Sequence, residues 1–467
     1  MKKLPAFKAY DVRGRIPDEI NEDLARDIGR AYAEFVRPLR VVVGRDIRLT
    51  SATLLEALVE GLRERGVTVV DIGLCGTEGV YFATSSGDDA GPFDGGIMVT
   101  ASHNPTDYNG MKFVREGSRP ISADTGLLQM AASIRAWFVD PKSRPAGVAP
   151  GARSEFDYRG DYVRHLLGYV SVPRLRPLKV VVNAGNGGAG GIVDLLEPHL
   201  PFDFIKVHHE PDGRFPNGVP NPMLEENRQS TVGAIRKSGA DLGLAWDGDF
   251  DRCFFFDETG RFIEGYYLVG LLAQSFLERE PGARIVHDPR LTWNTLDLVR
   301  RAGGSAVLCK SGHAFIKQKM REVDAAYGGE MSAHHYFRNF SYCDSGMIPW
   351  LLVLERLSTS GKTLSELVDE RISLFPCSGE INLKVPDGKA AIRVVQETFI
   401  ADAKAVDYTD GLSLEFADWR LNLRSSNTEP LIRLNVESRG SAMLMTDRTA
   451  EVIACLQRVG AERPPGH

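Results

Sequence analysis

One pattern occurs three times along the chain, and it restricts the possible fold more than any other feature of the sequence. In each copy an apolar strand leads through a Gly- or Asp-bearing turn into an amphipathic helix, a second strand, and a third strand that ends in polar residues. The copies occupy residues 41–105, 180–249 and 284–332. Short apolar runs that alternate with helical patterns are typical of α/β units with mainly parallel strands. The sequence therefore predicts three mixed-sheet α/β domains that share one topology.

Each copy predicts three strands and one helix. The strands are expected at residues 41–43, 68–72, 95–100, 180–182, 204–207, 241–246, 284–287, 306–309 and 325–329, and the helices at 51–65, from 190 and from 293. Ligands of parallel α/β sheets bind at the carboxyl ends of the strands. Because the most unusual polar loop of each copy follows its last strand, we expect the three loops to meet in one cleft.

The chain of 467 residues is long enough for about two to four domains. Linkers are expected at residues 141–151, which are rich in Pro, Gly, Ala, Ser and Arg, at 257–261, and at 375–379. After the third linker the pattern changes to alternating strands, such as 380–385, and a closing helix after Thr446, which predicts a smaller α+β domain. The four predicted domains are 1–148, 149–258, 259–374 and 375–467.

Charge, cysteine content and hydropathy exclude several classes of protein. The chain has 56 Lys and Arg against 62 Asp and Glu, a formal charge of −6, whereas an unselective nucleic-acid binder carries the opposite balance. Six scattered cysteines without a C-x-x-C pair indicate neither a disulfide framework nor a zinc site, and they are typical of a reducing compartment. Lys8 and Asp11 interrupt the first apolar residues, and no long uncharged apolar window follows, so we expect neither a secretory signal nor a transmembrane helix. We therefore expect a cytoplasmic protein without nucleic-acid or membrane partners.

The segment Thr-Ala-Ser-His-Asn-Pro at residues 100–105 follows a predicted buried strand. A serine on such a loop, here Ser102 with His103 beside it, is a candidate nucleophile or phosphate carrier. The alternative is a Ser- and Asn-rich turn closed by Pro105, since turns commonly use these residues. The chain contains no G-x-S-x-G, which argues against the nucleophile elbow of a serine hydrolase.

Carboxylates occupy alternate positions in Asp-Gly-Asp-Phe-Asp-Arg at residues 247–252. They are Asp247, Asp249 and Asp251. Such hard oxygen ligands suit Mg²⁺, and they would repel one another without a cation. An EF-hand loop begins similarly, and Glu258 would fit its twelfth position, but Arg252 stands where that loop requires Gly. Residues 253–256 predict a buried strand instead, and the remaining alternative is a solvated acidic turn.

Gly-Asn-Gly-Gly-Ala-Gly at residues 185–190 matches the G-x-G-x-x-G pattern of dinucleotide-binding proteins, and Glu210 lies about 20 residues further on. A lone match in a chain with 47 Gly is weak evidence, and no other segment indicates a nicotinamide site. A tight strand-to-helix turn is the favoured interpretation.

Two further polar loops are candidate binding sites. Arg-Ser-Ser-Asn-Thr-Glu-Pro at residues 424–430 suits a phosphate group, although a polar turn before a strand at 431–436 is the alternative. Glu330, Ser332 and the histidines at 334–335 suit sugar hydroxyls, and the two histidines are not a metal pair because neighbouring strand residues face opposite ways. Basic residues in or beside these loops, each alternatively a plain surface charge, are Arg13, Lys112, Arg252, Arg290, His313 and Arg424.

Taken together, these segments resemble the α-D-phosphohexomutase family, and within it the bacterial phosphomannomutases. The resemblance covers essentially the whole chain and rests on Phe-Lys-Ala-Tyr-Asp-Val-Arg-Gly at 7–14, the loops at 100–105 and 247–252, Gly-Glu-Met-Ser at 329–332, and the loop at 424–430. It implies three α/β domains and a fourth, TATA-binding-protein-like α+β domain around a deep central cleft.

The resemblance also implies an activity. It is the interconversion of mannose 6-phosphate and mannose 1-phosphate through a phosphoserine and a hexose 1,6-bisphosphate, for GDP-mannose and surface polysaccharide synthesis, with action on glucose phosphates left open. The implied cofactors are Mg²⁺ and hexose 1,6-bisphosphate, the partners are hexose phosphates, and the implied state is a monomer or weak homodimer.

Residue roles follow from the same resemblance. Ser102 would be the phosphoserine, and one of its phosphate oxygens would join Asp247, Asp249 and Asp251 around Mg²⁺. The other implied catalytic residues are His103, Lys112, Arg13, Arg252 and His313. The implied substrate-binding residues are Tyr10, Arg290, Glu330, Ser332, His334, Arg424, Ser426, Asn427, Thr428 and Arg433. The chain departs from the usual pattern at Ala333, where Gly is frequent, at Arg290, where Lys is frequent, and at Glu429, and these departures affect sugar preference only.

Three other classes of function remain open from the sequence. A metal-dependent sugar-phosphate phosphatase would share the carboxylate loop and the phosphate-binding loop. A nicotinamide-dependent oxidoreductase would rest only on residues 185–190, and a non-catalytic sugar-phosphate binding protein would need no phosphoserine.

Overall fold

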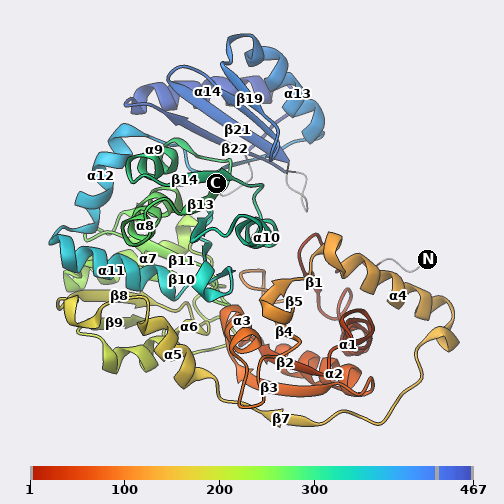
Figure 1. The fold of residues 1–467 in the computed structure, drawn as a ribbon. Coiled ribbons are helices and arrows are strands. Elements are labelled where there is room, and N and C mark those ends of the chain that lie inside the picture. The colour runs from red at the N-terminus through yellow and green to blue at the C-terminus, as the bar shows by residue number, and fades with distance from the viewer. Residues whose placement is uncertain (1–3, 426–430, 464–467) are drawn as a thin grey trace. The chain divides into compact units, whose positions relative to one another are not determined.

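The computed structural model of the chain describes residues 4–425 and 431–463, and its residues form two compact units. The first unit contains the chain up to Phe262 together with His334–Gly361, and the second contains Ile263–Ala333 and the chain from Lys362 onward. The segment His334–Gly361 therefore returns to the first unit after the chain has entered the second. Figure 1 colours the elements in chain order.

The first sheet of the first unit has the strand order β1-β5-β4-β2-β3-β7, with β6 paired to β5. Its strands are β1 (Val12–Arg15), β2 (Arg40–Arg45), β3 (Thr68–Leu74), β4 (Gly95–Val99), β5 (Tyr108–Arg115), β6 (Arg119–Pro120) and β7 (Arg153–Glu155). Strands β3, β2 and β4 are parallel, and β5 is antiparallel to β4 and β1. The helices of this part are α1 (Glu22–Val36), α2 (Ser51–Arg63), α3 (Thr77–Ser86) and α4 (Leu127–Val139). All three valines of the run 41–43 are buried, as expected for a parallel strand covered on both faces.

The second sheet of the first unit has the order β12-β11-β10-β8-β9. Its strands are β8 (Lys179–Asn183), β9 (Asp203–Val207), β10 (Leu242–Trp246), β11 (Cys253–Phe256) and β12 (Phe262–Ile263), and its helices are α5 (Arg159–Leu167), α6 (Ala189–Leu196) and α7 (Gln229–Ser238). Strands β9, β8 and β10 are parallel, and β11 is antiparallel to β10. The returning segment contributes the hairpin β16 (His335–Phe337) and β17 (Cys343–Asp344) and helix α11 (Ile348–Ser360). It docks on this sheet, since the indole N–H of Trp246 donates to the carbonyl of Gly346 at 2.9 Å.

The second unit begins with three parallel strands in the order β14-β13-β15. They are β13 (Arg284–His287), β14 (Ser305–Leu308) and β15 (Tyr327–Gly329), with helices α8 (Gly265–Arg279), α9 (Trp293–Arg301), α10 (His313–Val323) and α12 (Leu364–Leu374). An antiparallel sheet follows, in the order β18-β22-β21-β20-β19. Its strands are β18 (Ile381–Lys384), β19 (Ala405–Asp407), β20 (Leu412–Glu415), β21 (Trp419–Ser425) and β22 (Leu431–Ser438), and its helices are α13 (Gly388–Phe399) and α14 (Ala442–Gln457).

The predicted repeat is confirmed. In all three copies the first parallel strand lies between the second and the third, in the orders β3-β2-β4, β9-β8-β10 and β14-β13-β15. The closing helix α14 begins at Ala442, earlier than expected, because the Ser441 side chain accepts a hydrogen bond from the Leu444 N–H and caps the helix there. All six cysteines are free thiols. No helix in the described part of the chain has the length and apolar character that crossing a bilayer requires.

Candidate active site

Ser102 follows β4 and has a strained backbone. Its φ of 50° lies in the left-handed region, which costs a residue with a side chain roughly 1–2 kcal/mol. Its N–H donates to Thr100 Oγ1 at 2.9 Å, and its Oγ lies 2.9 Å from both Asp247 Oδ2 and His103 Nδ1. Strained residues of this kind cluster at functional sites. The expected meeting of the loops after β4 and β10 is therefore confirmed within the first unit.

Close backbone packing joins the two loops. A Cβ built on Gly248 would lie 2.5 Å from the carbonyl oxygen of Ser102, a distance that real Cβ atoms do not tolerate. Glycines 187 and 188 of the G-x-G-x-x-G segment also pack against this loop, with Gly187 near the Gly248 carbonyl and Gly188 near the Phe250 ring. These contacts support the interpretation of residues 185–190 as a tight turn. The turn packs against residues 247–252, which we call the acidic loop.

The three aspartates of that loop are buried together. Asp247, Asp249 and Asp251 place carboxylate oxygens within 4.8 Å of one another. Burial, with the neighbouring carboxylates, raises the pKa of Asp247 to about 7. Burial would also raise the pKa of Asp249, but the Lys112 ammonium holds it below its ordinary value.

Lys112, on β5, places a positive charge against Asp249 and Asp251. Its Nζ donates to Asp249 Oδ2 at 2.7 Å, to Asp251 Oδ2 at 2.5 Å and to Thr77 Oγ1 at 3.2 Å. Burial opposes the charged amine, yet the two carboxylates raise the pKa of Lys112 above its ordinary value.

The donor set of the acidic loop suits a magnesium ion. Oδ1 of Asp247 and Oδ1 of Asp249 are buried without a hydrogen-bond partner among the described residues. Hard carboxylate oxygens that converge and lack donors are what Mg²⁺ requires. The three aspartates therefore form a group that can hold a metal ion.

Two arginines and His103 surround Ser102. Arg252 contacts Asp247 and His103, and its Nη2 lies 3.4 Å from Ser102 Oγ. Arg13 donates to Asp11 at 2.5 Å and to Asn104 at 2.7 Å. Burial first, and then the two guanidinium charges, hold the pKa of His103 well below its usual range. His103 therefore lies beside Ser102 in a cationic surrounding.

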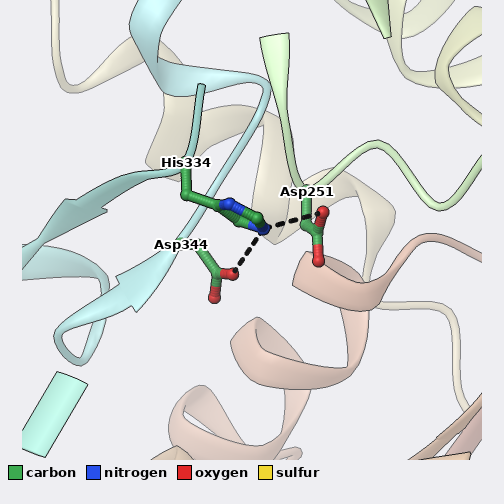
Figure 2. A group of neighbouring side chains, drawn as sticks. All are labelled: Asp251, His334 and Asp344. Atoms are coloured by element: carbon green, nitrogen blue, oxygen red, sulfur yellow. Dashed lines mark ion pairs between the residues drawn. The ribbon is translucent and has the colours of Figure 1, made fainter. Parts of the chain in front are cut away.

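His334 lies between two carboxylates, as Figure 2 shows. Its Nε2 is 3.6 Å from Asp251 Oδ1 and 4.0 Å from Asp344 Oδ2. An isolated β-bridge between Arg252 and His334 holds the returning segment beside the acidic loop. These side chains also have the donor types of a metal site, and the imidazole forms ion pairs with the two carboxylates only when it is protonated. His335, by contrast, is buried in β16, and burial lowers its pKa to about 3.

In the second unit, the side chain of Arg290 forms hydrogen bonds with residues of three segments. Its guanidinium donates to Asp288 at 2.9 Å, to Ser332 Oγ at 3.2 Å, to Glu380 at 3.3 Å and to Glu330 at 3.4 Å. Burial opposes the charge, but Asp288 and the two glutamates raise the pKa of Arg290. Glu330 also accepts the N–H of Gly312 at 2.9 Å, so the start of α10, at His313, lies beside it.

Glu380 is the anionic centre of the same unit. Arg424 Nη2 lies 3.0 Å from Glu380 Oε2, and Arg433 Nε lies 3.8 Å from Glu380 Oε1. Although burial opposes ionisation, Arg290, Arg433 and Arg424 lower the pKa of Glu380 to about 2. Of the predicted phosphate loop, Ser426, Asn427 and Thr428 lie outside the described residues. Tyr10 is half-buried shortly before β1.

Four models of one family match the chain in order. They are the alpha/beta/alpha domains I, II and III of phosphoglucomutase/phosphomannomutase, at residues 4–135, 160–260 and 264–375, and the C-terminal domain, at residues 380–454. The chain belongs to the phosphoglucomutase/phosphomannomutase family. The predicted family, fold class and enzyme class are thereby confirmed.

Individual members of the phosphoglucomutase/phosphomannomutase family match over nearly their whole length. A protein of Xanthomonas campestris pv. campestris named "Phosphohexose mutases" is 62% identical, over 96% of this chain and 98% of the relative. The "Phosphomannomutase" of Escherichia coli K12 is 57% identical, over 98% of this chain and 100% of the relative. The crystal structure of a family protein from Burkholderia thailandensis superposes with a TM-score of 0.88 at 34% identity, over 99% and 100% of the two chains.

The four domain boundaries, the cleft that they share and the roles of the individual residues stay predictions. Arg48 also contacts the site, since its guanidinium donates to the carbonyl of Ser102 at 3.0 Å. Sequence reasoning missed five residues of these groups, namely Arg48, Thr77, Asp288, Asp344 and Glu380. The rule that sites lie at the carboxyl ends of strands offered a signal for Arg48, after β2, and for Asp288, after β13. Thr77, after β3, had the same signal, whereas Asp344 had none, because only the tertiary fold brings it beside Asp251 and His334.

Proposed function

We propose that this chain is a phosphohexomutase that interconverts mannose 6-phosphate and mannose 1-phosphate through a phosphorylated Ser102 and a hexose 1,6-bisphosphate. The observation that carries the proposal is the position of Ser102 Oγ, 2.9 Å from Asp247 in a group of three buried carboxylates. A strained nucleophile against a cation site is the arrangement that phosphoryl transfer needs. The name of the Escherichia coli relative supports mannose as the sugar.

Charge neutralisation is the first requirement of this reaction. A phosphoserine carries about −1.5 to −2 charges at pH 7. Asp247, Asp249 and Asp251 would hold Mg²⁺, which when bound draws charge from the transferring phosphoryl group. Arg252, whose Nη2 lies 3.4 Å from Ser102 Oγ, adds a fixed positive charge beside the serine. The Lys112 ammonium offsets part of the negative charge of the aspartates.

Proton movement is the second requirement. When the phosphoryl group leaves Ser102 Oγ for a sugar hydroxyl oxygen, that hydroxyl must lose its proton. We assign the acceptor to Nε2 of His334, because Asp251 and Asp344 on either side stabilise the imidazolium that results. Ser102 Oγ takes up one proton as the phosphoryl group leaves it, and His103 Nδ1, 2.9 Å from Oγ, is placed to carry that proton. In the return step Oγ gives up this proton and bonds to the phosphorus at the other end of the bisphosphate, while His334 Nε2 returns its proton to the sugar oxygen that is released.

Substrate binding is assigned to the second unit. Arg424 and Arg433 already hold the carboxylate of Glu380, so their guanidinium groups are oriented for an anion. We infer that they grip the phosphate that is not transferred, and that Glu330 and Ser332, held by Arg290, accept and donate hydrogen bonds with sugar hydroxyls. A bisphosphate that turns over must present either phosphate to Ser102, so the same residues would serve both orientations.

The experiment is a side-by-side assay of mannose 1-phosphate and glucose 1-phosphate, with Mg²⁺ and a trace of hexose 1,6-bisphosphate. The proposal expects conversion to the 6-phosphate without net release of inorganic phosphate. Stoichiometric phosphate release would instead establish the phosphatase. The same assay gives the sugar preference. We also propose that the protein is cytoplasmic, that it is a monomer or weak homodimer, and that it serves nucleotide-sugar synthesis.

A further inference from the structure

Arg48 donates hydrogen bonds to four backbone carbonyls of the segment 100–108, which contains Ser102 and which we call the Ser102 loop. Its Nη1 donates to Pro105 O at 2.7 Å and to Tyr108 O at 3.0 Å, and its Nη2 donates to Ser102 O at 3.0 Å and to Asn104 O at 2.5 Å. The side chain is 2% exposed. Arg48 has no role in the phosphoryl and proton transfers proposed for Ser102 and His334.

The guanidinium also has an acidic neighbour, since Arg48 Nε lies 3.5 Å from Asp46 Oδ2. Asp46 Oδ1 accepts the backbone N–H of Arg48 at 3.0 Å and the hydroxyl of Ser51 at 2.5 Å, while the N–H of Asp46 donates to Val99 O at 2.9 Å. The ring of Phe215 lies 5.4 Å from the guanidinium carbon. Arg48 is therefore connected through Asp46 to β4 and to the start of α2, and it packs against Phe215 in the connection between β9 and α7.

Side chains of the loop contact Asp247, Arg252 and Arg13, whereas the hydrogen bonds within its backbone are local. Within it, Asn104 N donates to Ala101 O at 3.0 Å and Tyr108 N donates to Pro105 O at 3.0 Å, but these are local turn bonds. The carbonyl of Ser102 is confined by Arg48 on one side and by the close packing of Gly248 on another. Among these four contacts the one to the Ser102 carbonyl is buried, and a buried carbonyl without a donor is unfavourable, so the conformation at Ser102 depends on the guanidinium.

We propose that Arg48 is a positioning residue of the phosphoryl-transfer reaction. Its guanidinium donates hydrogen bonds to four backbone carbonyls of the loop, and it thereby keeps Ser102 in its left-handed conformation with Oγ directed at Asp247. The inference rests on the proposed function of Ser102 as phosphoryl carrier. Lysine cannot replace this arginine, because an ammonium is a compact point charge, whereas the planar guanidinium presents several donors in fixed directions.

The test compares Arg48→Lys with the matched control Arg63→Lys. Arg63 lies in the same domain and its Nε donates to one carbonyl, Gly151 O at 2.8 Å, in a segment without site residues. A misplacement of about 1 Å of reacting groups can reduce turnover about 100-fold. We expect kcat of Arg48→Lys for mannose 1-phosphate to fall about 10- to 100-fold, with KM changed less than about threefold because the sugar phosphate is held by the second unit. Arg63→Lys should keep kcat.

The rate is divided by the concentration of enzyme that is both folded and phosphorylated. Thermal unfolding gives the folded fraction, and intact-mass measurement gives the phosphorylated fraction. If Arg48→Lys does not fold, Arg48→Gln, which keeps two N–H donors, replaces it in the same comparison. A kcat within about twofold of the wild type, or an equal loss of kcat in Arg63→Lys, overturns the positioning role. Absence of phosphate on Ser102 in bisphosphate-treated wild type overturns the proposed function and the inference together, so the two failures are distinguishable.

Discussion

Replacing Gly248 with alanine tests the packing between the Ser102 loop and the acidic loop. The new Cβ would lie 2.5 Å from the carbonyl oxygen of Ser102, and the next neighbour, the carbonyl carbon of Ser102, is 3.4 Å away. If 3.4 Å is taken as an ordinary contact, the two loops must separate by 0.9 Å (3.4 − 2.5) along this direction. The neighbour is backbone, so no flexible side chain can move aside instead.

That separation acts directly on the reacting atoms. The same carbonyl is bound by Arg48, and Ser102 Oγ lies 2.9 Å from Asp247, the residue before Gly248. A shift approaching 1 Å predicts a fall in kcat of about 100-fold, and overpacking of this kind lowers the free energy of unfolding by about 1–3 kcal/mol. Steady-state kinetics with mannose 1-phosphate and urea unfolding measure the two effects.

Gly233→Ala is the matched control for this variant. Gly233 is an exposed residue of α7, and its added Cβ would meet nothing within 4 Å. Alanine in a helix interior is favoured over glycine by about 0.5–1 kcal/mol, so the control should be slightly more stable and fully active. If Gly248→Ala keeps kcat within about threefold of the wild type, the reasoning from loop packing to catalysis is wrong.

Three further predictions concern the metal, the phosphate and pH. Asp249→Asn removes a charged ligand, so we expect Mg²⁺ affinity, measured by calorimetry, to fall more than about tenfold; unchanged affinity would contradict the metal site. Arg424→Ala removes a charge-assisted contact of about 1.5–3 kcal/mol, so KM should rise about 10- to 150-fold for both mannose 1-phosphate and mannose 6-phosphate, and an unchanged KM would reduce the loop at 424–430 to a polar turn. Burial lowers the pKa of His335 to about 3, below the value of about 6.5 in an unfolded chain. The unfolded chain therefore binds more protons between these values, so stability falls as the pH drops below about 6.5, by about 1 kcal/mol from pH 7 to pH 5.5. Urea unfolding at both pH values should show this loss in the wild type and less of it in His335→Gln; equal losses in the two proteins would refute the assignment.

Much of the fold could be predicted because local patterns determine it. The apolar runs at 41–43 and 180–182 lie in β2 and β8, and the predicted strand at 253–256 is β11. Such runs identify strands without knowledge of their partners. The predicted start of α14, after Thr446, is wrong, because the Ser441 side chain caps the helix and it begins at Ala442.

The site was predictable only where its residues stand together in the chain. Asp247, Asp249 and Asp251 share one loop and form one group, as their spacing indicated. Lys112 and Asp249 meet across 137 positions of sequence, and no local pattern announces that contact. Glu380 had no signal either, because its neighbours Arg290 and Arg424 come from distant strands and loops. Charge pairs of this kind depend on tertiary packing, which a single sequence does not show.

The most direct test of the central claim is the fate of a phosphate on Ser102. Intact-mass measurement of enzyme treated with hexose 1,6-bisphosphate is followed by addition of mannose 1-phosphate in excess over the enzyme, without further bisphosphate. The account predicts one phosphate on the wild type, its transfer to the sugar as a bisphosphate, and neither phosphate nor appreciable turnover in Ser102→Ala. Wild-type turnover in Ser102→Ala, or a phosphate that remains on the enzyme during turnover, would contradict the account.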